Sequence, residues 1–144
     1  MIRLHGTCVM VDDAGVLLRG PSGGGKSDLA LRLIEAGARL VADDYVEAEV
    51  EGDHLVVRPP ATIAGLLEVR GLGVLKLDYL ASAPLMLIID LVAAEAIERL
   101  PDTVPMEEVC GVPIRRLALH PWEISAAAKV RLAVRVVTGN IISL

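Results

Sequence analysis

The chain has 144 residues, of which 53% are hydrophobic, and a formal net charge of −5. This length and composition suit one folded domain over residues 1–144 and exclude a disordered tail. Phe is absent and the aromatic residues are Tyr45, Tyr79 and Trp122, so platforms for stacking single-stranded nucleic acid are nearly missing. Together with the acidic net charge, this argues against a nucleic-acid partner.

The cysteines and the N-terminal sequence indicate a cytoplasmic protein. Cys8 and Cys110 lack C-x-x-C spacing, so we expect two free thiols in a reducing compartment and no zinc site. The N-terminus has no apolar core of a signal peptide. The apolar run at residues 84–89 is far too short to span a bilayer, and we expect no membrane association.

Strand signals dominate the first third of the chain. Residues 4–12 alternate loosely and predict a strand, which a turn at residues 13–15 joins to a partner strand at 16–20. Apolar residues at helical spacing predict a helix over 27–37. The next apolar run predicts a buried strand at 38–42, directly before two aspartates.

The rest of the chain mixes hairpins with a crossover connection. The remaining predicted elements are a hairpin of strands 46–50 and 54–58, a short helix followed by a glycine-rich loop within 61–80, strands at 85–92 and 112–119, and a helix over 123–137. Hairpins beside a crossover predict an α/β domain with a mixed sheet, and not a purely parallel one.

The segment GPSGGGKS at residues 20–27 fits the G-x-x-x-x-G-K-[ST] pattern of a phosphate-binding loop, or P-loop. Glycines let the backbone curl around an anion, and the following helix adds the positive end of its dipole. Lys26 can reach the β- and γ-phosphates, and Ser27 offers a hydroxyl to Mg²⁺. We therefore predict that a nucleotide binds with Mg²⁺ at Gly20, Pro21, Ser22, Gly23, Gly24, Gly25, Lys26 and Ser27; the resemblance described below implies that it is ATP.

Phosphoryl transfer also needs a base for the acceptor and a carboxylate near the metal, and three acidic positions compete for these roles. Asp43 and Asp44 end a strand just after the P-loop helix, so one could lie near the metal and the other act as base, or both could form an acidic turn. Asp90 ends LMLIID, which is the pattern of a Walker-B metal ligand and also of a solvated strand end. Glu68 lies beside a glycine-rich stretch that could approach a ligand.

Other charged residues carry weaker signals. By pattern alone His5, His54 and His120 read as structural or surface histidines rather than catalytic ones. Arg99, in the sequence AIERL, is a candidate phosphate contact, or else a solvated helix end.

Taken in order, these motifs resemble a known family. His5-Gly6, GPSGGGKS, LVADDYV and LLEVRGLGVL closely resemble the catalytic domain of bacterial HPr kinase/phosphorylase, and EVRGLG at residues 68–73 is the most specific element. The resemblance implies an α/β P-loop kinase domain of the HPr kinase/PEP carboxykinase type with a mixed, largely central sheet. It implies phosphorylation of a serine of HPr, a phosphocarrier protein, with Mg-ATP, and the reverse phosphorolysis by inorganic phosphate.

The resemblance also implies roles for individual residues. His5 matches an active-site histidine, Lys26 the catalytic P-loop lysine and Ser27 a magnesium-binding serine. Asp44 matches the residue that accepts the serine proton, and Arg99 matches an active-site arginine. Two further acidic residues match metal-associated positions, Asp43 and Glu68. Asp90 becomes a weaker candidate for a metal ligand, because the family does not use a Walker-B aspartate there.

The chain departs from the family's larger members at both ends. Those members carry an additional N-terminal domain, whereas this sequence begins at the strand with His5 and resembles the short forms of some proteobacteria. The C-terminal stretch at 119–134 matches only loosely, so no role is carried over to Lys129 or Arg131. A homo-oligomer, a hexamer by the resemblance, is expected.

Two other functions stay open on the sequence. A small-molecule kinase with the same P-loop would need a compact acceptor pocket and an arginine-rich lid, which the sequence does not suggest. A nucleotide-binding regulatory module without catalysis would not need Asp43, Asp44, Glu68 and Arg99 together.

Overall fold

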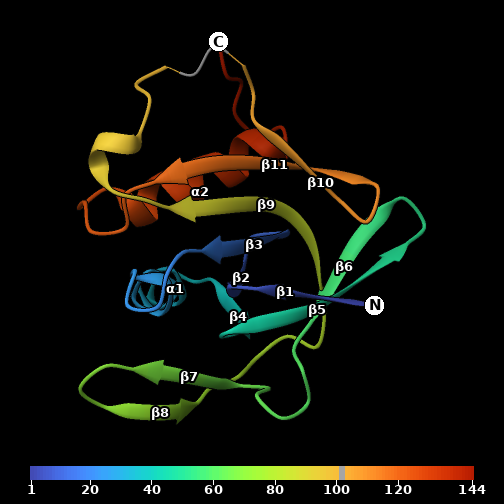
Figure 1. The fold of residues 1–144 in the computed structure, drawn as a ribbon, viewed down its shortest axis with the longest axis vertical. Helices are drawn as coiled ribbons and strands as arrows, with labels where there is room; N and C mark the ends of the chain where they lie inside the picture. The colour runs from blue at the N-terminus through green and yellow to red at the C-terminus, as the bar shows by residue number, and fades with distance from the viewer. Residues whose placement is uncertain (101–102) are drawn as a thin grey trace.

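The computed structural model describes residues 1–100 and 103–144. Its main feature is one mixed sheet of nine strands, with the order β1-β5-β6-β9-β3-β2-β4 and with β11 and β10 continuing beyond β9 (Figure 1). The strands are β1 (Ile2–His5), β2 (Thr7–Val11), β3 (Ala14–Arg19), β4 (Arg39–Ala42), β5 (Tyr45–Glu51), β6 (His54–Arg58), β9 (Ala83–Leu91), β10 (Met106–Val109) and β11 (Val112–Leu119). Strands β3, β9 and β11 are parallel, so the predicted mixed sheet is confirmed.

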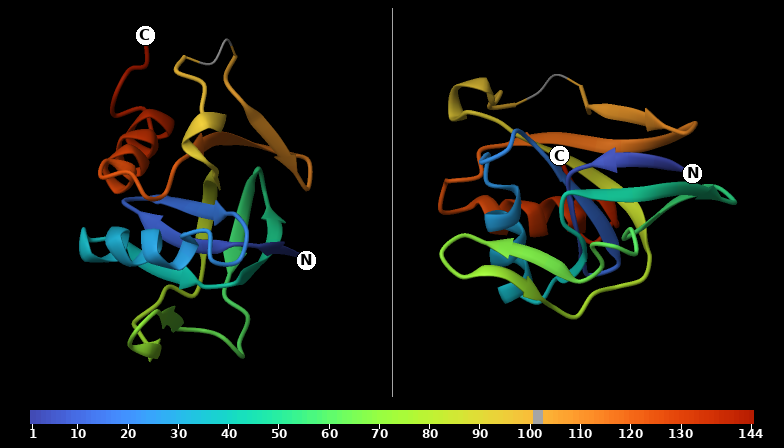
Figure 2. Two further views of the ribbon diagram at one scale, coloured as in Figure 1. Left: turned by 60° about the vertical axis from the view of Figure 1, so that its left-hand side comes forward. Right: turned by 60° about the horizontal axis from the view of Figure 1, so that its bottom comes forward.

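The long strand β9 joins the two halves of this sheet. Its start pairs with β6, and the rest of it pairs with β3 on one side and β11 on the other. The strand bends strongly, so that β1, β5 and β6 lie across the layer of β2, β3 and β4 (Figures 1 and 2). A core of buried aliphatic side chains, among them Leu17, Val46 and Ile88, packs within this folded sheet.

The two helices cover the face of the sheet that is turned away from this core. They are α1 (Lys26–Glu35) and α2 (Ala126–Val137), and a short 3-10 helix, η1 (Ala94–Ala96), follows β9. The buried faces of the helices, including Leu29 and Val130, pack on Val16 and Leu87 of the sheet in a second core. With so few aromatic residues, both cores depend on Leu, Val, Ile and Ala. In the described part of the chain, no helix is long and apolar enough to cross a membrane.

The strand expected at residues 4–12 is in fact two strands, and the reason is Gly6. Its φ of 143° is unfavourable for other residues, and a Cβ there would lie 2.5 Å from the carbonyl oxygen of Leu18. The chain therefore changes partners at Gly6: β1 pairs with β5, and β2 pairs with β4 and β3. The turn that follows β2 lies at Asp12 and Asp13, one residue earlier than expected.

The helix and loop expected within residues 61–80 are wrong. This stretch contains a second, two-stranded sheet of β7 (Leu66–Val69) and β8 (Gly73–Lys76). Gly71 and Gly73 adopt positive φ at the turn, and Leu67 is buried while its neighbour Glu68 is exposed, which is strand alternation. Strand β10 was not predicted from sequence, and α2 begins three residues later than expected.

Candidate active site

The P-loop connects β3 to α1, as the glycine pattern predicted. Gly23 and Gly25 adopt φ values of 76° and 96°, and the amide of Gly24 donates to the carbonyl of Pro21 at 2.9 Å. Lys26 folds back over the loop, and its Nζ donates to the carbonyls of Gly20 (2.7 Å) and Pro21 (3.0 Å). The predicted phosphate-binding residues thus form one continuous loop at the N-terminus of α1, where backbone amides and the helix dipole favour an anion.

Asp43 is the centre of the polar cluster beside this loop. Its Oδ1 accepts hydrogen bonds from the hydroxyls of Ser27 (2.9 Å) and Thr7 (2.8 Å) and from the backbone amide of Asp44 (3.1 Å). Its Oδ2 accepts a bond from the backbone amide of Glu68 at 3.3 Å. One carboxylate therefore joins β2, α1, the end of β4 and β7, although the two hydroxyl donors lie 36 and 16 residues away in the chain.

Asp44 and His5 lie together at the point where the sheet changes partners. Asp44 is exposed, has a φ of 75°, and accepts a bond on its backbone carbonyl from the amide of Gly6 at 2.8 Å. His5 is the residue before Gly6, and it faces Tyr45, the residue after Asp44, in the β1–β5 ladder. The break at Gly6 therefore brings His5 beside the Asp43-Asp44 pair.

Glu68 and Arg99 have less direct relations to this cluster. The backbone of Glu68 contacts Asp43, while its side chain is exposed on β7. Arg99 is exposed after η1, and no hydrogen bond or ion pair of its side chain joins it to the other predicted residues in the described ranges. The catalytic and metal-binding roles of both residues stay predictions.

The donor set fits Mg²⁺ that arrives with a nucleotide. Among residues 1–100 and 103–144, no cluster of three or more His, Cys, Asp or Glu side chains could hold a metal by itself. Mg²⁺ often needs only one or two carboxylates, because substrate phosphates and waters supply the other ligands. The Ser27 hydroxyl and the Asp43 carboxylate, 2.9 Å apart beside the P-loop, match that requirement.

Thr7 is a member of this site that the sequence reasoning missed. Its side chain is completely buried, and its hydroxyl donates to Asp43. The available signal was its place directly after His5-Gly6, but a threonine in a strand is common and carries no chemistry by itself.

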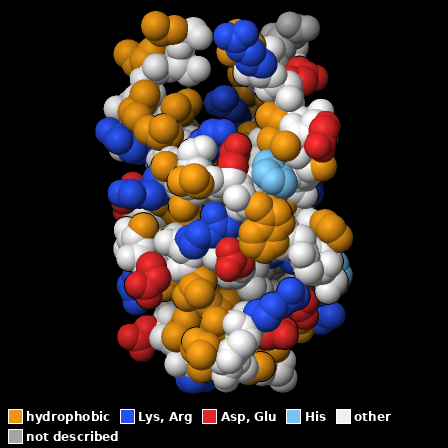
Figure 3. Space-filling model, turned by 90° about the vertical axis from the view of Figure 1, so that its left-hand side faces the viewer, with side chains coloured by type: hydrophobic (Ala, Val, Ile, Leu, Met, Phe, Trp, Pro, Cys, Tyr) orange, Lys and Arg blue, Asp and Glu red, His pale blue; other side chains and the backbone are white. Residues whose placement is uncertain are grey.

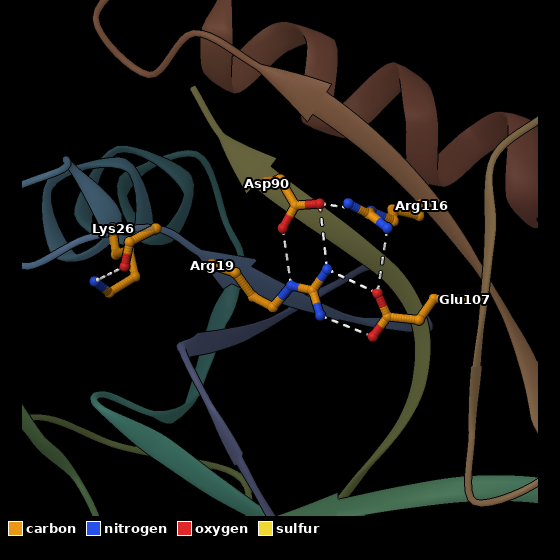
Figure 4. A network of polar contacts seen from close by, with 6 residues as sticks. Arg19, Lys26, Asp90, Glu107 and Arg116 are labelled. Atoms are coloured by element: carbon orange, nitrogen blue, oxygen red, sulfur yellow. Dashed lines mark hydrogen bonds and ion pairs between the residues drawn. The ribbon is translucent and has the colours of Figure 1, made fainter. Parts of the chain in front are cut away.

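A second polar cluster lies across the neighbouring strands, on the face opposite the helices (Figure 4). Arg19 donates through Nε to Asp90 at 2.9 Å and through both terminal nitrogens to Glu107 at 2.8 Å, while Arg116 donates to Asp90 at 2.6 Å. Burial raises the pKa of Asp90, but the bonds from Arg19 and Arg116 outweigh it and leave that pKa below its ordinary value. Asp90, the Walker-B candidate on sequence, is thus held by two guanidinium groups.

Arg19 and Glu107 in this network are also stabilised in their charged forms. Hydrogen bonds from Arg19 lower the pKa of Glu107, and the bond to Glu107 is the main cause of a raised pKa at Arg19. Glu107 belongs to β10, an element that the sequence did not predict, so this network was outside the reach of sequence reasoning.

The fold and the site together define a mixed α/β protein with a P-loop and an adjacent carboxylate pair. The family model for the HPr serine kinase C-terminal domain matches residues 1–141, and the chain belongs to that family. The structure also resembles that of the Hpr(Ser) kinase/phosphatase from Coxiella burnetii, with a TM-score of 0.80 and 24% identity over 97% of this chain and 90% of that one. That likeness concerns the fold.

Proposed function

We propose that this chain is a Mg-ATP-dependent protein kinase that phosphorylates a serine of an HPr-type phosphocarrier protein. The proposal includes the reverse reaction, phosphorolysis of the phosphoserine by inorganic phosphate. We also propose that the domain is of the HPr kinase/PEP carboxykinase type and that the protein works in the cytoplasm. The observation that supports it is the contrast between two adjacent carboxylates: Asp43 accepts a hydrogen bond from the P-loop residue Ser27, whereas Asp44 is exposed beside it.

In the forward direction, Asp44 would act as the general base. It would take the proton of the acceptor serine while the serine oxygen bonds to the γ-phosphorus and the bond from that phosphorus to ADP breaks. In the reverse direction it would return the proton to the serine oxygen as inorganic phosphate takes the phosphoryl group and forms pyrophosphate.

Other residues would hold the phosphates and stabilise their charge. Lys26 bonds to loop carbonyls at the place where a triphosphate would lie, and its ammonium could turn to the β- and γ-phosphates. Ser27 and Asp43 would hold Mg²⁺, which neutralises phosphate charge when bound. Glu68 and His5 would complete the pocket around the acceptor, and Arg99 would contribute a further cation.

The decisive experiment is intact-mass analysis of an HPr-type protein incubated with this chain and Mg-ATP. We expect the gain of one phosphate, and we expect Asp44→Asn to reduce the rate by a factor on the order of 10²–10⁴ while nucleotide binding persists. Asn tolerates the left-handed backbone of Asp44, so the variant should fold. Asp12→Asn is the matched control, because Asp12 is also exposed at positive φ but lies in the β2–β3 turn.

The alternatives give different results in the same assay. A small-molecule kinase would transfer phosphate to a small acceptor and not to the HPr-type protein. A regulatory module would bind nucleotide without any transfer.

Two further experiments test the other parts of the proposal. Adding inorganic phosphate to phosphorylated HPr-type protein tests the reverse reaction, and Arg99→Ala tests the proposed cation. Light scattering would measure whether the chain forms the oligomer that the family resemblance implies.

A further inference from the structure

The further inference concerns Trp122, the single tryptophan of the chain, which has no part in the proposed chemistry above. Its side chain is 57% exposed in the loop between β11 and α2. A lone exposed apolar residue is common and needs no explanation. The position of this one is informative, because its ring atom Cζ2 lies 3.2 Å from where a Cβ on Gly25 would be. The indole therefore lies against the last glycine of the P-loop.

The two residues just before Trp122 tie its loop to other parts of the molecule. Pro121 is buried against Gly25, and its carbonyl accepts a bond from Arg32 of α1 at 2.5 Å. The ring of His120 donates from Nδ1 to the carbonyl of Val92 at 3.0 Å, which ties this loop to the one after β9. Because the neighbouring residues are fixed, little ordering of the loop is needed before a ligand can use the indole face.

The order of the strands indicates which end of a nucleotide would meet Trp122. Asp43 directly follows β4, and β4 lies with β2 on one side of β3. Ser27 of α1 donates a hydrogen bond to Asp43. Strands β9 and β11 lie on the other side of β3 and run parallel to it, so their carboxyl ends share the edge that carries the P-loop. If the terminal phosphates face Asp43, the nucleoside points toward the loops after β9 and β11. Trp122 follows β11 by three residues.

From these observations we infer that Trp122 stacks on the base of the bound nucleotide. The inference rests on the proposed function, since it requires that the P-loop hold a nucleotide. The chain has few other aromatic residues, and the face with the P-loop mixes apolar and charged side chains (Figure 3). Stacking does not read hydrogen-bonding groups, because every base has a π-face. We therefore expect ADP and GDP to engage Trp122 similarly.

A hollow of about 470 Å³ on the other face of the sheet is the competing place for the base. It is lined by Arg19, Gly20, Asp90, Leu91, Val92, Pro105, Arg116, Leu117 and Ala118. Arg19 and Asp90 in its lining already bond to each other, and Arg116 also donates to Asp90, so Arg19 and Asp90 have little hydrogen-bonding capacity left for a nucleobase. Ala118→Leu would narrow this hollow and serves as the test of it.

The experiment uses the fluorescence of Trp122, since no other tryptophan contributes. Titration with Mg-ADP should quench or shift the emission, whereas tripolyphosphate, which has phosphates but no base, should bind with a much smaller change. Trp122→Ala should weaken ADP binding between about fivefold and a hundredfold by calorimetry and leave tripolyphosphate binding unchanged. Trp122→Phe should recover part of the affinity. Ile124→Ala, at a fully exposed apolar residue of the same loop, is the matched control and should change nothing.

Three results would overturn the inference. The first is ADP binding in the wild type with no change in emission. The second is equal ADP affinity in Trp122→Ala and the wild type, and the third is a loss of ADP affinity in Ala118→Leu with none in Trp122→Ala. Each of these results leaves nucleotide binding intact, so none of them contradicts the proposed function. If neither ADP nor tripolyphosphate binds the wild type, the proposed function fails and the inference fails with it.

Discussion

Asp43 and Asp90 both stand at the carboxyl end of an apolar strand, yet their surroundings differ in kind. Asp43 accepts hydrogen bonds from two hydroxyls and two backbone amides, all of them neutral donors. Asp90 is bonded to two guanidinium groups, from Arg19 and Arg116. In the described part of the chain no Lys or Arg forms an ion pair with Asp43. Hydrogen bonds therefore hold the Asp43 carboxylate in one orientation, and no Lys or Arg of the described residues balances its negative charge.

This difference shows why a strand-end aspartate by itself is a weak functional signal. A carboxylate that is paired with arginines has little attraction left for an arriving metal, and its role is to hold β3, β9 and β11 together. A carboxylate held by neutral donors keeps its charge for a cation that comes with the substrate. The sequence shows two similar strand ends, and the partners of each aspartate decide what it can do.

The largest expected difference between Asp43 and Asp90 is in the Mg-ADP affinity of their variants. Asp43→Ala should weaken Mg-ADP binding by about 10- to 100-fold, because it removes the carboxylate that orients Ser27. Asp90→Ala should change this affinity by less than about twofold. Calorimetry with Mg²⁺ and with a chelator measures both, and the Asp43 effect should disappear in the chelator. Equal losses in the two variants would contradict the comparison.

The second expected effect separates them by stability. Asp90→Asn should lower the free energy of unfolding by about 1–2 kcal/mol, since it weakens charge-assisted bonds to two arginines that are partly exposed. Asp43→Asn should cost less, because Asn keeps an acceptor for neutral donors. Denaturant midpoints at constant m-value give both numbers. If Asp43→Asn proved the more destabilising, the assignment of structural and functional roles would be reversed.

A third, smaller effect concerns pH. The ordinary pKa values of Asp90 and Glu107 are 3.8 and 4.5, and both are lowered in the folded protein. At acid pH the unfolded chain therefore binds more protons at these groups than the folded one does. Their stabilisation is fully present above about pH 5 and is lost as pH falls through the lowered values. Unfolding free energies at pH 3 and pH 6 should differ more in the wild type than in Asp90→Asn. Parallel pH profiles would argue against the network as their source.

The smallest expected effect refines the description of Asp43. Thr7→Val keeps the shape of a completely buried side chain and removes one of the hydroxyl donors to Asp43. We expect Mg-ADP affinity to fall about threefold, in keeping with roughly 0.5–1.5 kcal/mol for one hydrogen bond. Thr7→Ser should restore it. Affinity that is not restored by Ser would mean that Thr7 acts through packing alone.

Features encoded in consecutive residues were predictable. The P-loop between β3 and α1 follows from glycine and lysine spacing within eight positions, and the long strand β9 follows from an uninterrupted apolar run. The order of His5-Gly6, GPSGGGKS, LVADDYV and EVRGLG also predicted the family that the domain model confirms. Such signals need no knowledge of which distant segments meet.

Features that depend on distant partners were not predictable. The break between β1 and β2 depends on the close approach of Gly6 to the carbonyl of Leu18, and the β7–β8 hairpin replaced an expected helix because the alternating burial of Leu67 and Glu68 is set by packing. The contact of Thr7 with Asp43 and that of Arg19 with Glu107 join residues 36 and 88 positions apart. By itself the sequence determined the phosphate loop, the elements that flank it and the family, because these signals lie in short-range spacing. Only the tertiary structure decided which aspartate is paired with arginines and which is bonded to neutral donors, because the partners of a carboxylate are the groups that the folded sheet brings to it.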